Sequence, residues 1–121
     1  MGKPVVYWEF WSKEGASVSK FYEEVFGWKI QYIPDINYRF VDTGAGFGIN
    51  GGIKPQEGPR PGNITLYIDV DDLDAYAQKI EAAGGKVIVA KQEVPNMGSY
   101  SLFQDPDGRV LGIWKQVGQQ F

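Results

Sequence analysis

The chain has 121 residues, of which 43% are hydrophobic and 22% are charged, a composition typical of one soluble globular domain. Its net charge is −3 and it has no run of Lys or Arg, which argues against nucleic acid or an anionic membrane as a partner. It contains no cysteine and no histidine, which excludes disulfides, thiolate metal sites and the commonest transition-metal ligand.

Two further absences bear on location and on metals. No apolar stretch approaches the roughly 20 residues that span a bilayer, and the N-terminal residues MGKPVVYWEF match neither a secretory signal nor a myristoylation pattern. We therefore expect a cytoplasmic protein. Any metal site would have to use oxygen ligands, which favour hard ions.

The first half of the chain begins with a predicted strand and an amphipathic helix. Residues 4–11 (PVVYWEFW) are β-branched and aromatic, as is typical of a strand. Ser17 is the predicted N-cap of the helix, and Gly27 is expected to end it. Apolar residues recur at the i, i+3, i+4, i+7, i+8 spacing of one helix face: Val18, Phe21, Tyr22, Val25 and Phe26.

Three short strands are predicted to complete this half. WKIQYI (28–33) and YRFVDT (38–43) should form a hairpin around the turn residues 34–37. The glycine-rich segment 44–53 predicts a turn and a short fourth strand. The segment KPQEGPRPGN (54–63) has the proline and glycine content of a linker.

The same order then begins again. NITLYIDV (63–70) alternates as a strand, Asp71 and Asp72 can cap a helix, and Gly84–Gly85 should end it. The apolar stripe of this helix is Leu73, Tyr76, Ala77, Ile80 and Ala83.

Three more strands are predicted after the second helix. They cover residues 86–94, 99–104 and 110–116, and DPDG (105–108) forms a tight turn between the last two, with Asp105 and Asp107 as turn residues.

The chain therefore reads as β-α-β-β-β written twice. The glycines that end the helices, Gly27 and Gly85, lie 58 residues apart, a repeat of about half the chain. We predict a single α+β domain made of two tandem β-α-β-β-β modules. Its parts are module one (1–53), a linker (54–62), module two (63–116) and a C-terminal tail (117–121).

Alternation divides the first strand into two faces. Trp8 and Phe10 should pack on the helix, which leaves Tyr7, Glu9 and Trp11 on the opposite face.

The same rule divides two later strands. The residues expected to face the helices are Ile64, Leu66, Ile68, Val70, Leu111 and Ile113. The residues expected on the opposite faces are Asn63, Thr65, Tyr67, Asp69, Val110, Gly112 and Trp114. Curved sheets would make these faces concave, either as hydrated surface or as ligand clefts; their large aromatic side chains favour a cleft.

Several stretches resemble the vicinal oxygen chelate superfamily, which includes glyoxalases, bleomycin-resistance proteins and extradiol dioxygenases. They are FYEEVFGWK (21–29), the GGI at 51–53, YIDVDDLDAYAQKIEAAGGKV (67–87) and FQDPDGRVLGIW (103–114). The resemblance implies a glyoxalase-like fold with curved mixed sheets around a cleft, and a homodimer. It also implies that enzymes of the family hold a divalent metal through four side chains, mostly His and Glu.

The resemblance places three of those four ligand positions on this chain. They fall at Tyr7, Asn63 and Gly112, and the remaining one lies around 50–52. None of the three is a carboxylate or an imidazole. We therefore expect no metal, no cofactor and no catalytic residue. An alternative is a hard ion held with waters by Glu9 and Asp69.

The leading hypothesis is a metal-free protein that binds a small, aromatic or planar organic molecule in an aromatic-lined cleft. Glu9 would attract a cationic group or accept a hydrogen bond there. One alternative is a divalent-metal-dependent lyase, isomerase or dioxygenase; another is a non-catalytic dimerisation module. The residues expected to line the cleft are Tyr7, Glu9, Trp11, Asn50, Asn63, Tyr67, Gly112 and Trp114.

Overall fold

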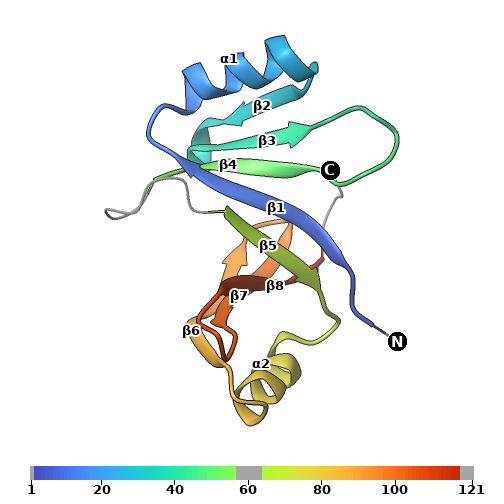
Figure 1. Ribbon diagram of the computed structural model, residues 1–121, viewed down its shortest axis with the longest axis vertical. Coiled ribbons are helices and arrows are strands. Elements are labelled where there is room, and N and C mark those ends of the chain that lie inside the picture. Colours follow the sequence, from blue (N-terminus) through green and yellow to red (C-terminus); the bar gives the residue numbers. More distant parts are fainter. Residues whose placement is uncertain (1, 57–63, 118–121) are drawn as a thin grey trace. The chain divides into compact units, whose positions relative to one another are not determined.

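The computed structural model describes residues 2–56 and 64–117 (Figure 1). The chain divides into two compact units, Tyr7–Ile64, and Met1–Val6 together with Thr65–Phe121. We call them the Tyr7 unit and the Thr65 unit. Asn63, most of the predicted linker and most of the C-terminal tail lie outside the described residues. Within the described ranges, no helix is long and apolar enough to cross a membrane.

The Tyr7 unit holds a four-stranded mixed sheet and one helix. Its strand order is β2-β3-β4-β1, with β1 and β4 parallel and the other pairs antiparallel. The elements in chain order are β1 (Val5–Ser12), α1 (Gly15–Phe26), β2 (Lys29–Ile33), the 3-10 turn η1 (Pro34–Ile36), β3 (Tyr38–Asp42) and β4 (Gly51–Pro55).

The Thr65 unit repeats this plan. Its strand order is β5-β8-β7-β6, with β5 and β8 parallel and the other pairs antiparallel. Its elements are β5 (Ile64–Asp69), α2 (Leu73–Ala82), β6 (Lys86–Val94), β7 (Gly98–Gln104) and β8 (Val110–Gln116). The prediction of an α+β fold built from two β-α-β-β-β modules is confirmed.

Two of the residues predicted to end the helices, Asp72 and Gly27, do so. The Oδ1 atom of Asp72 accepts a hydrogen bond from the N–H of Ala75 at 3.1 Å, so Asp72 caps α2. Gly27 ends α1 in the left-handed conformation, at φ 71°. The prediction that Ser17 caps α1 is wrong, because α1 starts two residues earlier. Ser17 lies in its first turn and donates to the carbonyl of Glu14 at 3.2 Å.

An aromatic cluster joins β1 to α1 in the Tyr7 unit. The ring of Trp8 lies 5.3 Å from that of Trp28, and Phe10 lies 5.8 Å from Tyr22 of α1. Tyr22 and Trp28 stack at 4.8 Å. The expectation that Trp8 and Phe10 pack on the helix side is therefore confirmed.

The predicted apolar stripe of α1 is only partly covered. Phe21, Val25 and Phe26 are each more than half exposed, at 53%, 56% and 59%. Only part of the apolar face of this short helix is covered by the four short strands, so some of its apolar residues stay exposed.

The core of the Thr65 unit forms where β5 and β8 meet α2. Val70, Leu73 and Ile113 are buried together, and Ile68, Tyr76, Ile80 and Phe103 pack against them. This confirms the predicted inward orientation of Ile68, Val70 and Ile113.

The prediction that Ile64 and Leu66 pack against the helix is wrong. The side chains of Ile64 and Leu66 are 65% and 40% exposed. Those of Thr65 and Tyr67, which alternate with them along β5, are only 3% and 7% exposed. The reason is the reach of α2, which packs mainly over β6, β7 and β8 and leaves the start of β5 uncovered.

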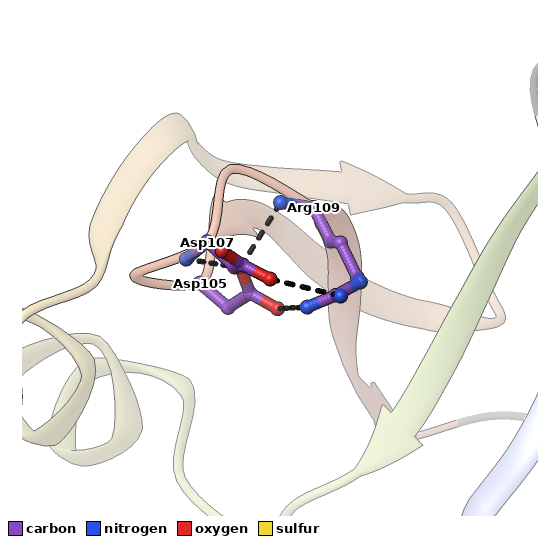
Figure 2. Close-up of polar contacts among 3 residues, drawn as sticks. All are labelled: Asp105, Asp107 and Arg109. Atoms are coloured by element: carbon purple, nitrogen blue, oxygen red, sulfur yellow. Dashed lines mark hydrogen bonds and ion pairs between the residues drawn. The ribbon is translucent and has the colours of Figure 1, made fainter.

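The turn between β7 and β8 is held by the acidic residues expected there (Figure 2). Oδ1 of Asp105 accepts the backbone N–H groups of Asp107 and Arg109 at 2.8 and 3.0 Å. The guanidinium of Arg109 forms ion pairs with Asp105 and Asp107 at 3.3 and 2.9 Å. Asp105 and Asp107 are confirmed as turn residues.

Candidate functional site

The candidate site lies on the face of the Tyr7 unit that points away from α1. Because Trp8 and Phe10 contact the helix side, the alternating residues Tyr7 and Glu9 point to the other face. Glu9 pairs across the β1–β4 ladder with Gly52.

The register of β3 adds a tyrosine to this face. Gly52 pairs with Phe40 of β3, and Tyr38 lies two residues before Phe40, on the same face. The sheet therefore brings Tyr7, Glu9, Tyr38 and Gly52 together from three strands.

The three polar side chains form a hydrogen-bonded chain. The hydroxyl of Tyr38 donates to Oε2 of Glu9 at 2.7 Å, and the hydroxyl oxygens of Tyr7 and Tyr38 lie 2.8 Å apart. A phenol has one hydrogen, and that of Tyr38 is given to Glu9, so Tyr7 donates to Tyr38. These hydrogen bonds run from the partly buried Tyr7 through Tyr38 to the carboxylate of Glu9, a residue that is only 8% exposed.

Burial and the acid keep both phenols protonated. Burial is the main cause that raises the pKa of Tyr38 above its ordinary value, and the negative charge of Glu9 raises it further. The pKa of Tyr7 is also raised, chiefly by burial, and the negative charge of Glu9 raises it further. Both side chains therefore act as neutral hydrogen-bonding groups at physiological pH.

Gly52 makes this arrangement possible. A Cβ atom at this position would overlap the hydroxyl and Cζ of Tyr38 and stand 2.6 Å from the hydroxyl of Tyr7. The two phenols occupy the space that any side chain at position 52 would take. Gly52 is required here for close approach.

The Thr65 unit contains a similar pairing of a tyrosine with a glycine. Tyr67 pairs with Gly112 across β5 and β8, and a Cβ atom at Gly112 would overlap the ring of Tyr67. Tyr100 meets Tyr67 edge to face, with ring centres 6.2 Å apart. The indole N–H of Trp114 donates to Oε1 of Gln116 at 2.8 Å.

The predicted site residues fall into separate groups. Tyr7 and Glu9 meet in the Tyr7 unit, and Trp11 continues their face of β1, where it pairs with Lys54 of β4. Tyr67, Gly112 and Trp114 belong to the Thr65 unit.

One predicted site residue, Asn50, stands apart from these groups, and another is not among the described residues. The amide oxygen of Asn50 accepts the backbone N–H of Thr43 at 3.1 Å and so joins the two ends of the glycine-rich loop. Asn63 lies outside the described residues.

Tyr38 is the site residue that the sequence reasoning missed. The available signal was the alternation of 38–43, which puts Tyr38 and Phe40 on one face. The sequence of that segment does not show which strand lies beside it in the sheet. The contact between Tyr38 and Glu9 therefore could not be predicted.

Two of the metal positions implied by the family, Tyr7 and Gly112, do not fit a metal ion. Gly112 has no side-chain donor and is covered by the ring of Tyr67; Gly52, which lies in the range 50–52 expected to hold another position, is covered by Tyr38. Tyr7 is a protonated phenol hydrogen-bonded to Tyr38. Within the described ranges no three Asp or Glu side chains gather closely enough to hold an ion.

Proteins of known sequence resemble this chain along most of its length. The candidate glyoxylase CFP32 of Mycobacterium tuberculosis is 33% identical over 103 residues, which cover 83% of this chain and 39% of that protein. The anthracycline biosynthesis protein DnrV of Streptomyces peucetius is 28% identical over 126 residues, which cover 91% of this chain and 46% of that protein. The chain thus spans less than half the length of these relatives.

A solved structure shares the fold. Methylmalonyl-CoA epimerase from Mycobacterium tuberculosis superposes with a TM-score of 0.70 at 13% identity, over 93% of this chain and 87% of that one. At this level of identity the likeness concerns the fold alone. Residues 9–113 match one family from the first strand to the last, and the chain belongs to the Glyoxalase/Bleomycin resistance protein/Dioxygenase superfamily.

Proposed function

We propose that this chain binds a small planar organic molecule on the aromatic face of the Tyr7 unit, without a metal ion. The observation that carries the proposal is a pair of glycines covered by tyrosine rings, one at a ligand position implied by the family and one within the range 50–52 expected to hold another. Gly52 lies under Tyr38, and Gly112 lies under Tyr67. A larger side chain introduced at either position would collide with a ring, and this packing supports a site that works without a metal ion.

The same face offers aromatic surface and a polar anchor. Tyr38 and Phe40 meet edge to face with ring centres 5.2 Å apart, and Trp11 lies further along β1 on this side. Ring contacts contribute about 0.5–1.5 kcal/mol each beyond the area they bury. The hydrogen-bonded chain of Tyr7, Tyr38 and Glu9 supplies directional polar contacts beside this surface.

One relative supports a planar ligand. DnrV is named for anthracycline biosynthesis, and anthracyclines contain a flat fused-ring system. This chain spans 46% of that protein, so a planar ligand for this chain is part of the proposal.

The test has a metal arm and a ligand arm. Elemental analysis of protein purified without chelator, and calorimetric titration with Mn²⁺, should find no stoichiometric metal. Anthraquinone-2-methanol and 2-naphthol should raise the midpoint of thermal unfolding, because a ligand at a hundred times its Kd stabilises the folded state by about 2.7 kcal/mol.

Matched variants locate the binding. Phe40→Ala should remove the thermal shift, whereas Tyr32→Ala, on the α1 side of the sheet, should keep it. Stoichiometric Mn²⁺ would overturn the proposal in favour of a metal-dependent lyase, isomerase or dioxygenase. Absence of a shift with both planar probes would leave a non-catalytic dimerisation module as the better explanation.

We also propose that the chain forms a homodimer, on the strength of the family. Light scattering of the eluting protein should give twice the 13.5 kDa mass of one chain. A monomer at all concentrations would contradict this.

A further inference from the structure

One side of α1 carries large apolar side chains that the Tyr7 unit leaves more than half exposed. Phe21 and Val25 lie one helical turn apart and are 53% and 56% exposed. The helix lies on one face of the sheet, and Ser19 is its buried residue (Figure 1). Because each residue of a helix turns by about 100°, Phe21 and Val25 point about 160° and about 120° away from Ser19. We call Phe21 and Val25 the α1 ridge.

The aromatic cluster beneath the α1 ridge holds it in a fixed shape. Phe21 meets Tyr22 edge to face with ring centres 5.0 Å apart, and Tyr22 stacks on Trp28 at 4.8 Å. Side chains that are already ordered lose less freedom when a partner covers them, so their burial in an interface costs less entropy. Aromatic side chains are also enriched at the centres of protein interfaces. The ridge is therefore suited to contact another protein surface.

The charged residues that flank the α1 ridge have both signs. Lys20 and Glu24 each precede one of the two ridge residues, so they lie together along one edge of the ridge. Both side chains are exposed, and neither has an ion-pair partner among the described residues. A surface edged by one cation and one anion is complementary to a second copy of itself that runs in the opposite direction. The charges therefore favour a second copy of this chain over a partner of uniform charge.

We infer that two copies of this chain associate through their α1 ridges, with the two helices antiparallel about a two-fold axis. In a pairing centred on Tyr22, Lys20 faces the partner's Glu24, and Glu24 faces the partner's Lys20. Phe21 then lies between the partner's Phe21 and the partner's Val25. A parallel pairing would instead bring like charges together. This inference rests on the proposed homodimer and deepens it by naming the contact surface.

Sedimentation equilibrium tests the apolar part of this contact. One pair of helices is a small interface, so we expect wild-type protein to dimerise with a dissociation constant on the order of micromolar. Phe21→Ala should raise this constant about a thousandfold, because loss of one central side chain costs a factor of about thirty and a two-fold interface contains it twice. Phe47→Ala removes a phenylalanine that is 84% exposed in the loop before β4, and it should leave the constant unchanged.

Charge exchange tests the antiparallel geometry separately. Lys20→Glu and Glu24→Lys each bring like charges together in their own homodimer, whereas a mixed dimer of the two variants brings opposite charges together twice. The mixed dimer should be about tenfold more stable than either variant homodimer at low ionic strength, and this preference should shrink at high salt. Glu23→Lys makes the same change of charge on the side of α1 opposite the ridge, and it should leave the dissociation constant unchanged.

The outcomes separate this inference from the proposals before it. A dimer that Phe21→Ala does not weaken, or a mixed dimer no more stable than the variant homodimers, would overturn the α1 contact and leave the homodimer standing. A chain that stays monomeric at millimolar concentration would overturn both. Binding of a planar ligand without metal is measured separately, by thermal shift and elemental analysis. If Phe21→Ala does not fold, the exposed charge variants decide the matter without it.

Discussion

Gly112 lies directly against the ring of Tyr67, its partner across β5 and β8, and a Cβ atom on Gly112 would overlap Cδ1 and Cε1 of that ring. Gly112→Ala should therefore destabilise the protein by about 1–3 kcal/mol, the usual cost of overpacking. Denaturant unfolding measures the change. Gly2→Ala is the matched control, since a Cβ there meets nothing within 4 Å. Equal stability of the two variants would show that the ring moves aside at no cost.

The same reasoning applies to Gly52, with a sharper test because the blocking residue is known. Gly52→Ala should cost about 1–3 kcal/mol in the wild type, because the methyl group meets the hydroxyl of Tyr38. In a Tyr38→Ala background the methyl group enters space that the ring has left, so the cost should be smaller. The double-mutant cycle should give a coupling energy of about 0.5–3 kcal/mol. If the effects of the two substitutions are additive, the cost of Gly52→Ala does not come from a clash with Tyr38.

High pH should destabilise the folded state through the paired phenols. The pKa of Tyr7 and that of Tyr38 are raised, mainly by burial, above the value near 10 that they have in the unfolded chain. Above about pH 10 the unfolded chain loses these protons while the folded chain keeps them, so stability falls as pH rises. Each phenol contributes a slope of up to about 1.4 kcal/mol per pH unit.

Urea unfolding between pH 8 and pH 11 measures this dependence. Tyr7→Phe should make the fall in stability shallower above about pH 10, because one of the two retained protons is gone. Tyr32→Phe, which removes a hydroxyl from the opposite face, serves as the control variant. If stability falls with pH equally steeply in wild type and Tyr7→Phe, Tyr7 is not one of the groups that cause the fall.

How far the sequence predicted this fold is clearest from its repeat. Alternation and helical spacing depend on neighbours along the chain, so both β-α-β-β-β modules and the split of Trp8 from Glu9 could be predicted. The exposure of Ile64 and Leu66 could not, because a strand's pattern does not say how much of it a helix of ten residues covers. The apolar face of β5 is real, but only its C-terminal part meets α2.

The candidate site was predictable only in part for a related reason. Glu9 stood out as an acid among aromatic residues, and its face followed from alternation. Its partner Tyr38 comes from β3, which reaches Glu9 only through the register of β4, and β4 follows a loop with three glycines of positive φ: Gly44, Gly46 and Gly48. Such a loop does not fix the register of the next strand from sequence alone. Gly52 and Gly112 could be noted in the sequence, but the tyrosine rings that pack against them could not be predicted.

Low pH should loosen the β7–β8 turn through Asp105. Its pKa is lowered, first by the backbone N–H of Arg109 and further by that of Asp107 and by the guanidinium. A carboxyl with a depressed pKa stabilises the folded state above its unfolded value near 3.9 and loses this effect as pH falls below it. Asp105→Asn should lower the melting temperature at pH 7 more than Asp107→Asn, whose carboxylate only pairs with exposed Arg109. The difference should shrink near pH 3, as scanning calorimetry would record, whereas a difference independent of pH would assign the effect to turn geometry rather than to the charge.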